Sequence, residues 1–383
     1  MSKRLLLLSF AIFILTILYL AFATLVLATA HNADDSWVTK TALRQPVSTL
    51  NAITINGAIF AISGESTQIY DSAFNSWTIK TKMPIPLEEF GIAAYQNKIY
   101  CIGGYINGAS PTNITLIYDI TADNWTRGSP MPTARGWLDA NVIDGKIYVI
   151  GGCNATSCIY QTEVYDPLAD AWATKTSIPE LATAYASAVV NNNIYVFYSN
   201  VTQIYDVTTD SWSVGASPTF PVFFGRAAAT SGVNAPLRIY VLSDNSSEQL
   251  SSATITNQIY DPQTDSWTTG ASLPTTRFGF GLALLNDRLY AIGGNTQTYR
   301  DFNDLLHGPY SAVFDTVEQY TPFGYDAAGL TVSPAIPQST PTPTASTVEQ
   351  ANYNLIIAVV VVIAVIGCLI YFYSKRKRKF RKV

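Results

Sequence analysis

The sequence predicts an all-β fold in which a four-stranded unit repeats along most of the chain, and two observations carry this prediction. A short β-branched and aromatic run, such as Ile147 to Ile150, recurs along the chain with the composition of a buried strand. After each of five such runs comes a Tyr-Asp pair with a Trp seven positions after the Tyr, at Tyr70, Tyr118, Tyr165, Tyr205 and Tyr260. A period of roughly 40 to 55 residues marks supersecondary units that must share a core.

Glycines and turn residues set the boundaries of these strands. Three of the apolar runs lead into a Gly pair, at Gly103-Gly104, Gly151-Gly152 and Gly293-Gly294, where a Cβ would prevent close approach of the backbone. Asn56-Gly57 and Asp144-Gly145 precede two of the runs and are strong two-residue hairpin signals. Each unit is therefore expected to hold four antiparallel strands, named a to d: a small-residue strand, the Ile-Tyr strand, the Tyr-Asp strand and the Trp strand.

These motifs resemble the kelch repeat, and the resemblance covers roughly residues 35 to 322. Six Ile-Tyr-like strands, counted from Ile59 onward, predict a six-bladed β-propeller at residues 31–326. The last unit has a third strand near Val317 to Tyr320 but lacks the Trp after it, whereas Asp35-Ser36-Trp37 copies the end of a unit without its beginning. We therefore expect this N-terminal segment to supply the outer strand of the last blade and to close the ring.

Two apolar segments flank the propeller and predict where it lies in the cell. Residues 1–30 read as a signal peptide or signal anchor, because a long apolar run follows two basic residues and ends in an A-x-A cleavage pattern. Residues 353–373 predict a transmembrane helix, which a basic tail follows at 374–383. By the positive-inside rule both basic ends face the cytoplasm, so we expect a single-pass protein of the cell membrane with an extracellular propeller.

The linker and the charge agree with this placement. Residues 327–352 are rich in Ser, Thr and Pro, a composition typical of an extended stalk without a packed core. Without the basic tail and the first two basic residues, the chain has 14 basic and 27 acidic side chains, a formal charge of about −13. An acidic ectodomain argues against nucleic acid as a partner, and we expect the membrane and an extracellular glycan or protein instead.

An exported chain can carry disulfides and N-linked glycans. Cys153 and Cys158 flank four residues of one loop, so an oxidising compartment permits a disulfide between them. Five Asn-x-Ser/Thr triplets offer acceptor sites for glycosylation, at Asn113, Asn124, Asn154, Asn200 and Asn245. All but Asn124 fall in or beside b-to-c connections, which share one face of the propeller with the d-to-a connections.

That face is also where the chain is least regular, since the b-to-c connections of the fifth and sixth units are long. Insertions collected on one face of a repeat array often form its binding surface. Eight residues near the starts of the a strands are expected around the mouth of the central channel as ligand-binding candidates: Glu88, Glu89, Arg135, Trp137, Tyr185, Arg226, Arg277 and Phe278.

Two interpretations of the arginines stay open. Arg135 and Arg277 each lie three residues after a Pro, where kelch repeats often carry Arg. In the structural interpretation they brace neighbouring blades. In the functional one they hold a carboxylate or a sugar as bidentate donors, with Trp137 as a stacking surface.

The resemblance also implies which enzyme classes to weigh. Some kelch-fold proteins are radical-copper oxidases, whose metal needs imidazole and phenol ligands, but this chain has only His31 and His307. We therefore expect no metal site and no cofactor. Others resemble sugar mutarotases, which need no metal, and Glu88 or Glu89 facing Arg135 would be the acid and base of such an enzyme.

The sequence thus predicts a non-catalytic binding or adhesion module at the cell surface. Its ligand, a glycan or a protein, is expected on the face that bears the b-to-c and d-to-a loops. A metal-independent carbohydrate-active enzyme of the mutarotase type is the alternative, and a structural envelope glycoprotein is the third interpretation.

Overall fold

The computed structural model describes residues 34–108, 110–244, 254–296 and 312–326. These residues contain no helix and form six four-stranded antiparallel sheets and one three-stranded sheet. They belong to one unit of the chain, Met1–Leu330, and a second unit comprises Thr331–Val383. No helix in the described part is long and apolar enough to cross a membrane. The segments predicted as signal peptide, stalk, transmembrane helix and basic tail lie outside the described residues.

The four-stranded sheets are numbered in chain order, each from its inner to its outer strand. Sheet 1 consists of β2 (Asn51–Ile55), β3 (Ala58–Ile62), β4 (Thr67–Asp71) and β5 (Ser76–Lys80). Sheet 2 consists of β7 (Gly91–Tyr95), β8 (Lys98–Ile102), β11 (Thr115–Asp119) and β12 (Asn124–Gly128). Sheet 3 consists of β13 (Ala140–Ile143), β14 (Lys146–Ile150), β15 (Thr162–Asp166) and β16 (Ala171–Lys175).

The second half of the ring repeats this order. Sheet 4 consists of β17 (Ala186–Val190), β18 (Asn193–Tyr198), β19 (Val201–Asp206) and β20 (Ser211–Gly215). Sheet 5 consists of β21 (Phe223–Ala229), β22 (Ile239–Asp244), β23 (Ile255–Asp261) and β24 (Ser266–Gly270). Sheet 6 consists of β25 (Gly281–Leu285), β26 (Arg288–Ile292), β27 (Val317–Thr321) and β1 (Ser36–Lys40). The small sheet consists of β6 (Leu87–Glu88), β9 (Tyr105–Ile106) and β10 (Ser110–Pro111).

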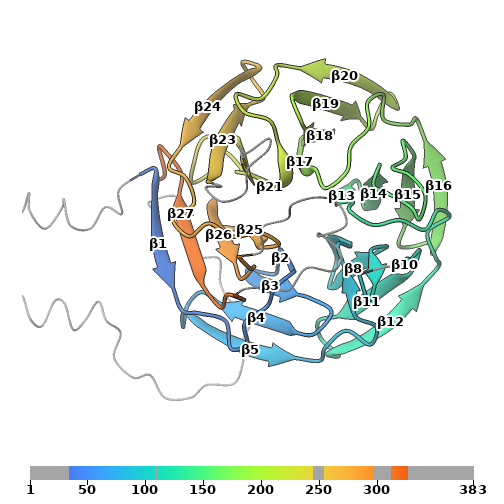
Figure 1. Ribbon diagram of the computed structural model, residues 1–383, viewed down its shortest axis with the longest axis horizontal. Coiled ribbons are helices and arrows are strands. Elements are labelled where there is room, and N and C mark those ends of the chain that lie inside the picture. Colours follow the sequence, from blue (N-terminus) through green and yellow to red (C-terminus); the bar gives the residue numbers. More distant parts are fainter. Residues whose placement is uncertain (1–33, 109, 245–253, 297–311, 327–383) are drawn as a thin grey trace, which may run out of the picture. The chain divides into compact units, whose positions relative to one another are not determined.

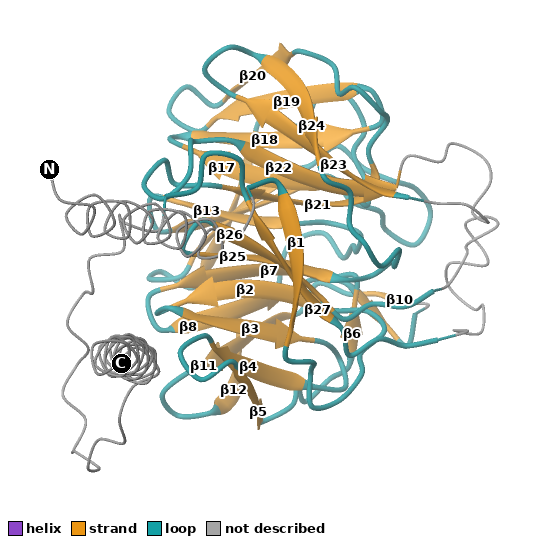
Figure 2. Cartoon of the chain, turned by 90° about the vertical axis from the view of Figure 1, so that its left-hand side faces the viewer, coloured by secondary structure: helices purple, strands orange, loops and turns teal. Residues whose placement is uncertain are grey.

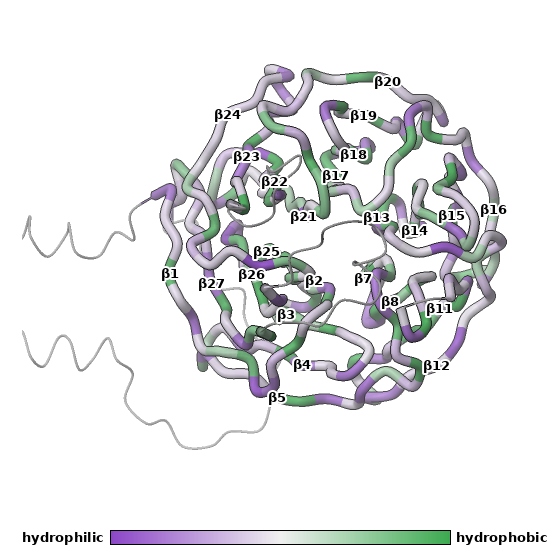
Figure 3. Tube along the Cα trace, viewed as in Figure 1, coloured by the Kyte–Doolittle hydropathy of each residue, from purple (hydrophilic) through white to green (hydrophobic). Residues whose placement is uncertain are grey.

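The six larger sheets follow one another around a ring (Figure 1). Each inner strand contacts the inner strands of the sheets before and after it, and β25 of sheet 6 contacts β2 of sheet 1. Figure 3 shows hydrophobic residues along the inner strand β17 and more hydrophilic ones along β24 at the rim. This is the arrangement of a β-propeller, in which apolar surface is buried between neighbouring sheets.

The core is accordingly shared between sheets. One hydrophobic cluster joins Tyr100 and Ile102 of sheet 2 to Ile147 and Tyr165 of sheet 3. Similar clusters occur at the other junctions. Because each sheet buries its faces only against its neighbours, no single repeat is expected to be stable alone.

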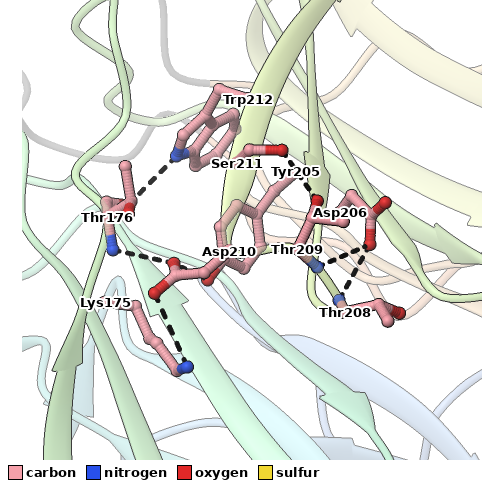
Figure 4. A network of polar contacts seen from close by, with 9 residues as sticks. All are labelled: Lys175, Thr176, Tyr205, Asp206, Thr208, Thr209, Asp210, Ser211 and Trp212. Carbon is pink, nitrogen blue, oxygen red and sulfur yellow. Dashed lines mark hydrogen bonds and ion pairs between the residues drawn. The ribbon is translucent and has the colours of Figure 1, made fainter.

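The Tyr-Asp…Trp motif forms a polar bracket between neighbouring sheets, which Figure 4 shows at the junction of sheets 3 and 4. Tyr205 donates its hydroxyl to Asp210 Oδ1, which also accepts the N–H of Thr176 at 2.9 Å. Trp212 donates its indole N–H to the carbonyl oxygen of the same Thr176 at 3.0 Å. Asp206 holds the intervening turn by accepting two of its backbone N–H groups. We call the Tyr, the acceptor and the Trp together the inter-sheet bracket.

The inter-sheet bracket occurs at all six junctions of the ring. In each, an Asp or Asn accepts the Tyr hydroxyl of its own sheet and a backbone N–H just after the outer strand of the preceding sheet. These acceptors all have φ between 46° and 54°, a region where Asn and Asp are enriched. They are Asn75, Asp123, Asp170, Asp210, Asp265 and Asp35.

The sixth bracket joins the two ends of the described ring, as the sequence predicts. β1 pairs with β27 in antiparallel register, with Trp37 opposite Tyr320, and Figure 2 faces this junction. Tyr320 donates its hydroxyl to Asp35 Oδ1 at 2.6 Å, and the same oxygen accepts the N–H of Ala271 at 2.6 Å. Trp37 donates its indole N–H to the Ala271 carbonyl at 2.8 Å. The closing strand therefore covers an edge of β27 that would otherwise be open to pairing with another chain.

Deleting residues 31–41 removes β1 and the sixth bracket. The thermal unfolding midpoint, measured by calorimetry, should fall by more than about 5 °C, since each lost kcal/mol is worth about 2–4 °C in chains of 150–250 residues. Deleting only residues 31–33 spares every described contact and should leave the midpoint in place. An unchanged midpoint for the longer deletion would show that the ring does not need β1.

Asp210 makes stability depend on pH. Burial alone would raise the pKa of Asp210, but the hydrogen bonds from Tyr205 and Thr176 outweigh it and the pKa is lowered. A carboxylate with a lowered pKa contributes stability above its unfolded pKa of about 3.9, and this contribution is lost as the pH falls through the folded pKa. At the junction of sheets 6 and 1 the acceptor is Asn75, which accepts the equivalent two hydrogen bonds without carrying a charge.

Asp210→Asn should therefore keep most of the free energy of unfolding near neutral pH and lose less of it than the wild type in acid. Asp210→Ala should lose about 2 kcal/mol already near neutral pH, because two donors lose their acceptor. Urea unfolding of the three proteins at neutral and acidic pH measures both effects. Equal destabilisation by Asn and Ala would mean that the bracket needs the charge and not the hydrogen bonds.

Candidate functional site

The inner strands surround a central channel that contains a cavity of about 450 Å³. Five residues pair with the fourth residue of the apolar run in the second strand of their sheet: Asn51, Gly91, Ala186, Arg226 and Gly281. In sheet 3, Asp139 directly precedes β13 and lines the cavity. Sheets 1, 3 and 5 contribute polar side chains, and the sheets between them contribute Gly or Ala. We call Asn51, Asp139 and Arg226 the polar layer of the channel.

Asp139 is the acidic group of the polar layer. Its Oδ1 accepts the N–H of Ala140 at 2.9 Å, and its Oδ2 accepts the hydroxyl of Ser187 at 2.7 Å. Asn141 in turn donates its side-chain amide to the Ser187 hydroxyl at 2.8 Å. Burial raises the pKa of Asp139, although the Ser187 hydrogen bond and the charge of Arg226 oppose the rise. This carboxyl therefore keeps its proton to a higher pH than an exposed aspartate does.

Arg226 is the cationic group of the polar layer and lines the cavity. Its guanidinium donates to the carbonyl oxygen of Gly225 at 3.2 Å, and its Nε has no hydrogen-bond partner. Within the described ranges no carboxylate lies at ion-pair distance from it. Its charge nevertheless counteracts the rise in pKa of both Glu89 and Asp139, so both carboxyls lie within its electrostatic reach. A weakly satisfied guanidinium in a cavity can bind an anion with charge-assisted hydrogen bonds.

The two glutamates expected at the mouth lie in and after β6. Glu88 pairs with Tyr105 of the small sheet, and Glu89 follows with φ 49°. Burial, and then the charge of Glu89, raises the pKa of Glu88. Burial also raises the pKa of Glu89, against the charge of Arg226. The expected partner of these glutamates, Arg135, pairs with a different carboxylate.

Arg135 and Arg277 do not reach the channel mouth, because both are fully buried. Arg135 Nη1 lies 2.5 Å from Glu163 Oε2, and Arg277 Nη1 lies 2.6 Å from Glu318 Oε2. Each guanidinium also donates to a backbone carbonyl of the second strand of its sheet. The expectation of two ligand-binding arginines is therefore corrected. The contacts support the bracing interpretation, in which each Arg fixes a d-to-a loop to the third strand of the sheet that it enters.

One sequence position explains why only two units carry this arginine. Two residues before the motif Tyr stand Glu163 and Glu318 in sheets 3 and 6. Sheets 1, 4 and 5 have a glutamine there: Gln68, Gln203 and Gln258. Each glutamine bonds the loop backbone directly, as Gln203 does by accepting the N–H of Glu180 at 2.8 Å and donating to its carbonyl at 3.0 Å. In these five sheets the loop is thus held by Gln alone or by a Glu–Arg pair, and sheet 2 has Leu116 at the same position.

Three predicted aromatic candidates are also buried. Trp137, Tyr185 and Phe278 are 4%, 3% and 5% exposed. Trp137 packs on Tyr105, with ring centroids 5.1 Å apart, and Tyr185 donates its hydroxyl to the Ile150 carbonyl at 2.7 Å. The expectation of Trp137 as a stacking surface is corrected, since its ring belongs to a packed cluster with Cys153.

Exposed aromatic side chains lie instead close to Arg226 in the chain. Phe220 and Phe224 are 39% and 40% exposed. Phe224 has φ 47° and falls in the irregular pairing between Phe223 and Arg226, which has the form of a β-bulge. Bulges re-aim side chains and are common beside functional sites. Phe224 is therefore an exposed ring two residues before Arg226 in the inner strand of sheet 5.

Sequence reasoning found Arg226 but missed its neighbours in the channel. Asp139, Asn141 and Ser187 stand at or in inner strands, where they interrupt otherwise apolar, small-residue runs. A polar residue at an inner-strand position is the signal that could have identified them, because such a residue needs a partner or faces the channel.

Comparisons with known proteins agree with this architecture. Residues 63–220 match the family model of the FKB95 Kelch-repeats domain. A stretch of 41 residues is 56% identical to Kelch-like protein 1 of Mus musculus and covers 10% of this chain and 6% of that protein. The solved structure of YjhT is similar with a TM-score of 0.59 at 15% identity, over 73% of this chain and 96% of that chain. The described residues form a β-propeller, and residues 63–220 resemble a kelch-repeat domain. At these levels of identity and coverage the comparisons support the fold and leave the ligand open.

The remaining predicted sites of the propeller lie outside the channel. Cys153 and Cys158 are joined by a disulfide, and Cys101 is buried in β8. Asn113, Asn154 and Asn200 follow second strands, Asn124 begins β12, and Asn245 lies outside the described residues. No group of three or more His, Cys, Asp or Glu side chains is placed to hold a metal in the described ranges, which include neither His31 nor His307.

Glu163→Ala should reveal the bracing role of Arg135. It leaves a buried guanidinium without its carboxylate, which should cost about 3–5 kcal/mol in urea unfolding. The double variant Arg135→Leu, Glu163→Leu removes both charges and should be less destabilised than Glu163→Ala. A loss below about 1 kcal/mol for Glu163→Ala would contradict the brace, since exposed ion pairs are worth no more than that.

Proposed function

We propose that this chain is a six-bladed kelch propeller that acts as a non-catalytic binding module at the cell surface. Its ligand binds the face that bears the b-to-c and d-to-a loops. The observation that carries the proposal is Arg226, a guanidinium that lines the central cavity without an ion-pair partner in the described ranges. Arg135 and Arg277 supply the contrast, because each of them is neutralised by a buried glutamate.

The chemistry of the channel favours an acidic saccharide as the ligand. A carboxylate or sulfate on the sugar would pair with Arg226, and sugar hydroxyls would exchange hydrogen bonds with the side chains of Asn51, Asp139 and Ser187. A cavity of about 450 Å³ has the size of a small-ligand site. The exposed ring of Phe224 can contact the apolar face of a sugar.

We also propose the membrane placement that the sequence predicts, with residues 1–30 as the export signal, 327–352 as the stalk, 353–373 as the span and 374–383 in the cytoplasm. The two ends of the described ring lie side by side, which is compatible with attachment of the propeller to the membrane through both of them. Asp34 Oδ2 accepts the N–H of Gly324 at 3.1 Å. Asp326 donates its N–H to Asn234, in the a-to-b connection of sheet 5. Both contacts lie on the face of the ring opposite the b-to-c loops.

A metal-independent carbohydrate-active enzyme of the mutarotase type is the second candidate, and Asp139 is the observation that favours it. A carboxyl of raised pKa in a cavity has the properties of a general acid. The pair expected from the sequence, Glu88 or Glu89 with Arg135, is not brought together, since Arg135 pairs with Glu163. Anomeric exchange followed by NMR, fast with the wild type and lost in Asp139→Asn, would establish this enzyme in place of the binding module. A structural envelope glycoprotein remains the third interpretation.

The binding proposal is tested with a panel of uronic-acid, sialic-acid and sulfated oligosaccharides and their neutral counterparts. Thermal shift and calorimetric titration should find binding of an acidic saccharide, and Arg226→Gln should weaken it at least tenfold, because a charge-assisted pair contributes about 1.5–3 kcal/mol. Arg127→Gln is the matched control, since Arg127 is exposed on the outer strand β12. Binding that survives Arg226→Gln, or silence of the whole panel alongside binding of an acidic peptide, would contradict the saccharide site.

A further inference from the structure

The described Asn-x-Ser/Thr triplets differ in how the folded chain presents them. A glycosylating enzyme recognises the Asn amide together with the hydroxyl two residues later. Both groups must therefore be accessible at once if the folded protein is to be an acceptor.

Two of the triplets fail this requirement, and a third is held in a strand. Thr115, which follows Asn113, is 1% exposed, and Thr202, which follows Asn200, is 0% exposed. The Thr202 hydroxyl also donates to a backbone carbonyl at 2.8 Å, so it is turned into the sheet. Asn124 and Thr126 are both exposed, but their triplet lies in β12 and pairs with β11 along its whole length, so its backbone must leave the sheet before an enzyme can bind it. An enzyme could engage these sites only after the sheets had opened.

Asn154 is presented in the opposite way. It lies in the short loop closed by the disulfide between Cys153 and Cys158. Thr156 is exposed and donates its hydroxyl to Asn154 Oδ1 at 3.0 Å. The same oxygen accepts the backbone N–H groups of Thr156 and Ser157, each at 2.9 Å. Amide and hydroxyl thus stand side by side in the fold before any enzyme arrives.

The hydrogen bonds also prepare the amide chemically. Three donors on Asn154 Oδ1 draw electron density toward the oxygen and make the amide N–H groups more acidic. The side-chain nitrogen has no hydrogen-bond partner among the described residues, so nothing in that part of the chain competes for it.

We propose that Asn154 is an N-glycosylation site of the folded protein and the preferred acceptor among the described triplets. Its use in the cell rests on the proposed extracellular placement. The donor is a lipid-linked oligosaccharide with a phosphate or pyrophosphate leaving group. A bond forms between Asn154 Nδ2 and C1 of the first sugar, the C1–O bond to the lipid phosphate breaks, and Nδ2 loses one proton. No oxidant or reductant takes part.

A glycan at this position would divide the ligand face. The loop that contains Asn154 follows β14 of sheet 3. Its first cysteine, Cys153, packs with Tyr105 and Trp137. Arg226 and Phe224 belong to sheet 5, two sheets further around the ring. The glycan would cover the side of the mouth at sheet 3 and leave the side of Arg226 open to a ligand.

The test uses the purified, folded full-length chain with Asn245→Gln as its background, because the Asn245 triplet lies outside the described residues. This protein is treated with a single-subunit oligosaccharyltransferase that accepts Asn-x-Ser/Thr and with a lipid-linked oligosaccharide. Intact-mass spectrometry should find one added glycan. It should be lost in Asn154→Gln and Thr156→Ala and kept in Thr156→Ser, which preserves the hydroxyl. Asn200→Gln is the matched control and should keep the glycan. Synthetic peptides that span the Asn113 and Asn200 triplets should be accepted, which would show that the fold is what excludes them.

An unmodified chain, or one whose glycan persists in Asn154→Gln, would overturn the proposal. This reaction supplies donor and enzyme directly and does not depend on export. Export is measured separately, by labelling Tyr160→Cys on intact cells with a membrane-impermeant maleimide, because Tyr160 is 48% exposed on the same connection. Modification of the purified chain without labelling on cells would overturn the extracellular placement and the use of the site in the cell, while Asn154 would remain the acceptor of the folded chain.

Discussion

Six copies of the inter-sheet bracket hold the sheets of this ring together, and the positions of the other features follow from them. In each bracket the N–H and C=O groups of one residue in the preceding sheet are both satisfied by side chains of the next sheet, as Asp210 and Trp212 do for Thr176. The indole ring of Trp212 packs on the motif Tyr205, with ring centroids 4.9 Å apart. Because Asp35 and Trp37 complete the sixth copy, the ends of the ring are joined by the same contact as every internal junction.

The rigid ring fixes where polar groups can serve a ligand. The cavity brings together the side chains of Asn51, Asp139 and Arg226, although they come from three separate sheets. Arg135 and Arg277 differ from Arg226, because each of them pairs with a buried glutamate. This contrast, and not the presence of arginine as such, is what supports the proposed ligand site at Arg226.

The sequence was a good guide to the strands and to ring closure, because the Tyr-Asp…Trp motif is local and its spacing is regular. It could not decide the role of Arg135, since the partner Glu163 lies 28 residues further along and in another strand. The residue two positions before the motif Tyr indicates this role, because a Glu there occurs with the buried Arg and a Gln there occurs without it. The exposure of Phe224 was not predicted for a different reason. It depends on a β-bulge, and the Phe-Phe-Gly-Arg sequence contains no signal that predicts this bulge.

One bracket, repeated six times, should make the ring a single cooperative unit that includes the junction of its ends. Native-state hydrogen exchange of the bracketed amides measures this, because each of these N–H groups donates to its acceptor across a junction. In a cooperative ring Ala271, at the junction closed by β1, exchanges as slowly as Thr81, Ser129, Thr176 and Ala216. Exchange of Ala271 many times faster than that of the other four would mean that the ring opens at its ends independently and is not one cooperative unit.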